Sequence, residues 1–159
     1  MNGITIEENR TGENLQLQVR KVIRASRQRV FDAWTRPETI RQWFGPGQIE
    51  ISSADVDARI GGTYRMEMQG TCDEIGNPSP RNSVSGKYLE VEPYDRLVFT
   101  WKGSWDPTEE TLVTVDLKDV EGGTEILLTH ERFTSTVSRD KHNHGWTGSL
   151  EKLAHIFAR

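Results

Sequence analysis

The stretch FTSTVSRDKHNHGWTGSLEKLAHIFAR, residues 133–159, decides how the rest of this chain can fold. Its large apolar residues recur at steps of four, three and four: Trp146, Leu150, Leu153 and Phe157. This spacing gathers them on one side of an α-helix. The opposite side carries polar residues, namely Ser149, Glu151, Lys152 and His155. We therefore predict a single amphipathic helix that ends at the chain terminus.

An isolated amphipathic helix is unstable in water and needs an apolar surface to pack against. The segments upstream alternate apolar and polar residues, which is the pattern of half-buried β-strands. They are Leu15–Ile23, Ile49–Ile51, Tyr64–Met68, Val84–Val91, Leu97–Trp101, Val113–Leu117 and Ile126–His130. We expect the helix to pack against a curved sheet made of these strands.

Two short helices are predicted between the first and second strands. Ser26 has a hydroxyl suited to capping a helix that places Val30, Phe31 and Trp34 on one face. Pro37 ends that helix, and a second turn runs to Trp43 before the Gly45-Pro46-Gly47 break. The remaining strands follow one another through short turns. This order predicts an α+β fold with an antiparallel sheet, since parallel strands would need helices between them.

The length of the chain fits a single domain. The chain has 159 residues, which we divide into a polar, flexible N-terminus at 1–13 and a single domain at 14–159. Residues 70–83 are rich in Gly, Pro and small polar side chains, and are predicted to form a long loop.

The composition of the chain limits which binding partners and which cellular location we expect. The net charge is -4, and the Lys and Arg residues are scattered, so we expect no nucleic-acid partner. Cys72 is the sole cysteine, which rules out an intrachain disulfide. No apolar run is long enough to cross a bilayer, and the N-terminus lacks an apolar signal region. We therefore expect a cytoplasmic protein without a membrane partner.

Five segments, in this order, resemble the family of activators of heat-shock-protein-90 ATPase, within the START/SRPBCC helix-grip superfamily. They are VFDAWTRPETIRQWFGP at 30–46, GGTYRMEM at 61–68, GKYLEVEPYDRLVFTW at 86–101, GGTEILLTH at 122–130, and the Gly145-Trp146 pair. The resemblance implies a six- or seven-stranded antiparallel sheet that grips the C-terminal helix. It also implies a deep cavity between the sheet and the helix for an apolar ligand.

The inward faces of the predicted strands supply residues that suit such a cavity. Those assigned to its interior are Tyr64, Met66, Met68, Phe99, Trp101, His130, Trp146 and Leu150, with Trp34, Trp43 and Phe44 near its mouth, and Val115 and Leu128 on the same faces. The alternative is that these aromatic and Met side chains simply fill the core. A slip of one residue in register would also exchange the two faces of a strand.

The candidate chemical groups each have a structural alternative. His130 could act as a base or orient a ligand, or it could be a hydrogen-bonded core histidine. Arg65 and Glu67 are assigned to a solvated face, opposite Tyr64. His142, His144 and His155 lack the spacing of a metal site. We assign no catalytic residue, metal or cofactor.

Three functions remain open. The first and favoured one is a non-catalytic protein that binds an apolar or aromatic small molecule. The second is an enzyme of cyclase, dehydratase or hydrolase type, which the superfamily permits. The third is a co-chaperone, although the eukaryotic activators dock through an additional N-terminal domain for which this chain has no room. A homodimer, through an exposed sheet edge or through the loop at 70–83, is a further expectation.

Overall fold

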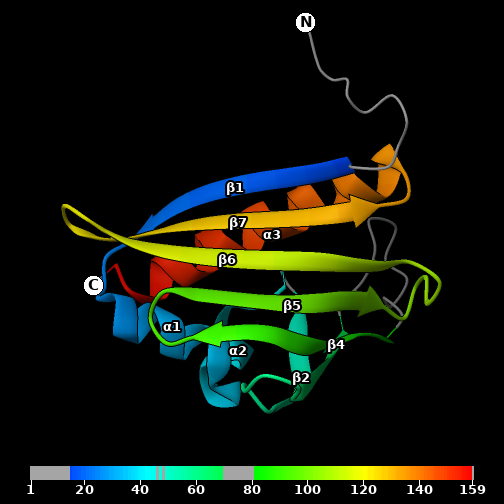
Figure 1. Ribbon diagram of the computed structural model, residues 1–159, viewed down its shortest axis with the longest axis horizontal. Helices are drawn as coiled ribbons and strands as arrows, with labels where there is room; N and C mark the ends of the chain where they lie inside the picture. The colour runs from blue at the N-terminus through cyan, green and yellow to red at the C-terminus, as the bar shows by residue number, and fades with distance from the viewer. Residues whose placement is uncertain (1–14, 46, 48, 70–80, 159) are drawn as a thin grey trace, which may run out of the picture.

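The computed structural model describes residues 15–45, 47, 49–69 and 81–158 (Figure 1). In this part of the chain the elements follow the predicted order. They are β1 (Leu15–Ile23), α1 (Arg27–Thr35), α2 (Pro37–Trp43), β2 (Glu50–Val56), β3 (Thr63–Gln69), β4 (Arg81–Glu92), β5 (Arg96–Gly103), β6 (Glu110–Val120), β7 (Gly123–Phe133) and α3 (Thr136–Ile156). The α+β prediction is confirmed.

The strands form one seven-stranded antiparallel sheet of order β1-β7-β6-β5-β4-β3-β2. Strands β2 to β7 pair with their neighbours in sequence. The first strand instead pairs with the last, with Leu17 opposite His130 and Ile23 opposite Thr124. Figure 1 shows α3 lying behind β1, β7 and β6, with the sheet curving around it. This is the helix-grip arrangement.

Helix α3 begins at Thr136, well before the Gly145-Trp146 pair, and ends at Ile156, earlier than the predicted end at the chain terminus. Ser135 caps its first turn, because its Oγ accepts the N–H of Ser138 at 3.1 Å. Leu150 and Leu153 are fully buried against the sheet, as the spacing predicts. Ser149 was assigned to the solvent side, yet it is buried. Phe157 lies one residue beyond the helix, where its ring packs under the Arg29 guanidinium.

The two short helices close one end of the space between the sheet and α3. Ser26 caps α1 as predicted, and Pro37 occupies the first turn of α2, where its missing N–H costs nothing. The indole of Trp43 donates to the carbonyl of Ala33 at 2.9 Å, which fastens α2 to α1.

Strand β4 begins at Arg81, so its first residues were wrongly assigned to the preceding loop. The rest of that predicted loop, the predicted flexible N-terminus and Cys72 lie outside the described residues. No helix in the described ranges is long and apolar enough to traverse a bilayer.

Candidate ligand pocket

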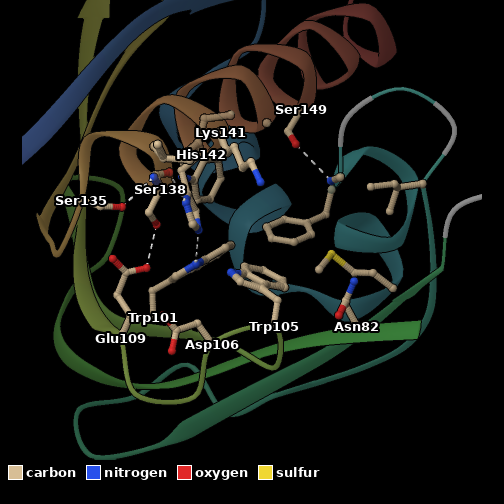
Figure 2. A pocket seen from close by; sticks show the side chains of 17 residues that line it. Asn82, Trp101, Trp105, Asp106, Glu109, Ser135, Ser138, Lys141, His142 and Ser149 are labelled. Atoms are coloured by element: carbon tan, nitrogen blue, oxygen red, sulfur yellow. Dashed lines mark hydrogen bonds between the residues drawn. The ribbon is translucent and has the colours of Figure 1, made fainter. Parts of the chain in front are cut away.

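A pocket of about 530 Å³ opens beside the N-terminal half of α3 (Figure 2). One wall is the helix itself. The others are the β5–β6 turn, the sheet, and the segment that follows α2. The lining residues are Phe44, Gly45, Ile49, Met68, Asn82, Trp101, Trp105, Asp106, Glu109, Ser135, Val137, Ser138, Lys141, His142, Gly145, Trp146 and Ser149.

The helix lines the pocket with a stripe of small and polar residues. Ser138, Lys141, His142, Gly145 and Ser149 recur at steps of three, one, three and four, so they share one face. Serine and glycine leave space where larger side chains would close it. This stripe lies beside the apolar one that packs on the sheet, and it explains why a volume stays open there.

The segment after α2 is attached to α3 by two hydrogen bonds. The N–H of Gly45 donates to the hydroxyl of Ser149 at 3.0 Å, and Lys152 Nζ donates to the carbonyl of Gly47 at 3.1 Å. Gly45 has φ of 92°, a conformation that side chains with a Cβ rarely adopt. The buried Ser149 hydroxyl therefore positions one wall of the pocket.

Glu109 attaches the opposite wall, the β5–β6 turn, to the start of α3. One carboxylate oxygen accepts the N–H and hydroxyl of Thr134, at 2.8 and 2.7 Å. The other accepts the hydroxyl of Ser138 at 2.7 Å. Burial alone would raise the pKa of Glu109, but these hydrogen bonds and nearby His142 lower it below its usual value. Glu109 is therefore a carboxylate whose oxygens are engaged.

His142 lies on the pocket wall as a neutral imidazole. Its Nδ1 is 2.8 Å from the carbonyl of Ser138, which only accepts, so Nδ1 carries the proton. Its Nε2 then accepts the indole N–H of Trp101 at 3.2 Å. Burial lowers the pKa of His142, although Ser138 and Glu109 act in the opposite direction. Both ring nitrogens are engaged within the protein.

His130 is completely buried and does not line the pocket. Its Nδ1 accepts the indole N–H of Trp146 at 3.0 Å, and its Nε2 lies 2.7 Å from the hydroxyl of Thr111. That hydroxyl in turn donates to the carbonyl of Trp101 at 3.1 Å. Burial, with a smaller effect of His142, holds the pKa of His130 well below its usual value. The structure therefore supports the core-histidine alternative.

Trp105 covers the pocket from the β5–β6 turn. Its ring lies against Gly103, where a Cβ would collide with it, and 5.8 Å from the ring of His142. The side chain is nevertheless 46% exposed, and Val137 on the facing helix is 62% exposed. Two large apolar groups at the rim are thus left in contact with solvent.

Comparison with known proteins agrees with the fold and the segment order. Residues 24–158 match the model of the family described as Activator of Hsp90 ATPase homolog 1-like protein. The chain belongs to this family. No curated protein matches the sequence.

Solved structures share the fold of this AHSA1-like chain. A Chromobacterium violaceum protein is 23% identical, with 91% of this chain and 99% of that one covered and a TM-score of 0.77. The AHSA1 protein of Silicibacter pomeroyi is 25% identical over 91% and 98% of the two chains, with a TM-score of 0.76. DynU16, a protein in the dynemicin biosynthetic locus, is 21% identical over 88% of this chain and 46% of its own, with a TM-score of 0.66.

The structure separates the residues that we assigned to one cavity into three groups. Those that line the pocket are Phe44, Met68, Trp101 and Trp146. Those that surround a second, much smaller void of about 20 Å³ are Trp34, Trp43, Tyr64, Met66 and Phe99, so Trp34 and Trp43 lie inside the protein rather than at a mouth. Those that are fully buried and line neither space are His130 and Leu150, together with the core residues Val115 and Leu128.

Several pocket residues were missed because they come from turns. Trp105, Asp106 and Glu109 belong to a segment that the sequence identifies only as a turn. The stripe on α3 could have been found, since small and polar residues at helical spacing beside an apolar stripe are visible in the sequence. Tyr64 was assigned to the cavity interior, but its hydroxyl donates to the carbonyl of Thr100 at 2.6 Å.

Proposed function

We propose that this AHSA1-like protein binds a small, largely aromatic molecule in the pocket beside α3 and does so without catalysis. The observation that carries the proposal is the pocket itself. Its volume of about 530 Å³ falls in the range of small-molecule sites, which is about 300–1,000 Å³. A protein this small keeps a space of that size open at the expense of packing contacts.

The lining supports an aromatic ligand. Phe44, Trp101, Trp105 and Trp146 offer ring faces and edges from three different parts of the chain. Such rings bind other aromatic groups in offset or edge-to-face arrangements. Trp105 and Val137 at the rim would lose exposed apolar surface when a ligand enters.

Two titratable groups of the lining, His142 and Glu109, favour binding over the enzymatic alternative. An acid–base catalyst needs a titratable group that can reach the substrate. Both nitrogens of His142 and both oxygens of Glu109 are engaged within the protein. The co-chaperone alternative draws on the family name alone, and assays of chaperone ATPase stimulation would separate it from the present proposal.

Titration with 8-anilinonaphthalene-1-sulfonate, followed by its own fluorescence and by quenching of tryptophan, tests the proposal. We expect saturable binding with one site per chain. Trp105→Ala should weaken it by roughly 5- to 30-fold, the effect of losing a buried aromatic contact. Native mass spectrometry of the purified protein should detect any co-purified ligand.

Leu89→Ala provides the matched control, because Leu89 is also a large apolar residue with 45% exposure but lies on β4 away from the pocket. It should bind the probe as the wild type does. An equal loss of probe affinity in Trp105→Ala and Leu89→Ala, or no saturable binding of the probe to the wild type, would refute the proposal.

A further inference from the structure

Trp34 Nε1 is the one buried side-chain nitrogen or oxygen, among the residues that the structure describes, that has no hydrogen-bond partner. The side chain is 5% exposed. An indole N–H can only donate, and a buried donor without an acceptor is destabilising. The nearby rings of Trp43 and Trp146, at centroid distances of 4.8 and 5.8 Å, offer π faces, which are much weaker acceptors than oxygen.

The Trp34 indole also borders the void of about 20 Å³. The residues around this void are aromatic or aliphatic, and none of them carries a formal charge. Burial raises the pKa values of its two phenols, Tyr64 and Tyr88, which therefore remain neutral. The residue that carries the unpaired donor thus lines an uncharged, largely apolar space.

Phe44 and Trp101 separate this void from the ligand pocket, since both residues line both spaces. The Phe44 ring lies with its centroid 5.8 Å from those of Trp43, Trp101 and Trp146. On one side it meets the packed interior, and on the other the open pocket. A change of its χ1 rotamer therefore has room in the direction of the pocket and would join the two spaces.

We infer that the pocket extends past Phe44 when a ligand enters, and that the indole N–H of Trp34 then donates to a neutral acceptor at the inner end of that ligand. The inference rests on the proposed function and specifies its ligand class. The molecule is flat and mainly apolar, and its leading atom is a carbonyl or ether oxygen. A carboxylate would be desolvated there with no cation to pair with.

Two probes of equal shape test the inference. 2-Acetylnaphthalene carries a carbonyl oxygen, and 2-isopropenylnaphthalene has a CH₂ group in its place. Titrations of ¹⁵N-labelled protein are followed through the five tryptophan indole N–H resonances, with that of Trp34 assigned from the wild-type protein by sequential NMR. We expect the ketone to move the Trp34 proton downfield, and the alkene to leave it without that shift.

Affinities give a second measurement. Trp34→Phe should weaken binding of the ketone by roughly three- to tenfold and leave that of the alkene unchanged, because one neutral hydrogen bond is lost. If the Trp101 and Trp146 indoles respond while Trp34 does not, ligands stop at Phe44 and this inference is overturned, although the proposed function stands. If no indole responds to either probe, both proposals fail.

Discussion

The indole N–H of Trp146 donates to Nδ1 of His130 at 3.0 Å, and this contact fixes the protonation of the histidine. Because indole nitrogen cannot accept, Nδ1 must be unprotonated, so the ring proton lies on Nε2 and is donated to Thr111. The Thr111 hydroxyl is then free to donate to the carbonyl of Trp101. This chain of hydrogen bonds joins α3 to β7, β6 and β5, and the tryptophans at its two ends, Trp146 and Trp101, line the pocket.

Thr111→Val should destabilise the protein, because it removes the acceptor of a fully buried N–H while preserving side-chain shape. The expected loss is about 1–3 kcal/mol of unfolding free energy, measured in urea. Thr114→Val on the same strand is the control, since Thr114 is only half-buried and lies three residues away, on the other face of the sheet. Similar losses of unfolding free energy in the two variants would contradict a stabilising role for the His130–Thr111 hydrogen bond.

Stability should fall as the pH drops below about 6.5, the ordinary pKa of histidine. The folded state holds the pKa of His130 well below that value, so the unfolded chain binds more protons in this window. The stability that neutral His130 contributes is therefore fully present above the pKa that histidine has in the unfolded chain, and it is lost as the pH falls below that value. His142 contributes with the same sign.

The comparison is between the wild type and His130→Gln, with urea denaturation at intervals from pH 7.5 to 5. The variant will be less stable than the wild type at every pH. Its unfolding free energy should depend less steeply on pH, by up to about 1.4 kcal/mol per pH unit. Parallel curves would show that His130 does not titrate on unfolding.

Glu109→Gln should cost about 1–3 kcal/mol at pH 7, because an amide cannot replace a carboxylate that accepts from Thr134 and Ser138 through both oxygens. Glu110→Gln, on the exposed neighbour, should change the unfolding free energy by less than about 0.5 kcal/mol. The folded-state pKa of Glu109 is lowered, so its contribution is present above about pH 4.3 and is lost in more acidic solution. A difference between the variants that grows in acid would be inconsistent with this role.

Two glycine substitutions should separate binding from stability. At Gly86 an added Cβ would collide with the backbone carbonyl of Thr100, which cannot move aside, so Gly86→Ala should cost about 3 kcal/mol. At Gly103 the colliding atoms belong to the Trp105 ring, which is partly exposed and can turn away. Gly103→Ala should therefore remain stable but bind 8-anilinonaphthalene-1-sulfonate as weakly as Trp105→Ala. If Gly103→Ala binds the probe as the wild type does, the position of the Trp105 ring is not needed for binding.

The fold was predictable because its signals are local. The spacing of Trp146, Leu150 and Leu153 predicts a helix with one apolar face, and alternation predicts the strands. The error at Ser149 has a physical cause: the wall after α2 lies against that face of α3 and covers a polar residue, using its hydroxyl as an acceptor for Gly45. Nothing near Ser149 in the sequence indicates that contact.

The amino-acid order by itself determined the elements, their antiparallel pairing and the family, because periodicity, caps and turn residues act over a few positions. Tertiary structure alone decided which aromatic residues enclose a space and which fill one. Phe44, Trp105 and Trp146 are more than forty residues apart and meet only after the sheet has curved around α3. Whether a volume stays open depends on all of its walls together, so no single stretch of the chain can specify it.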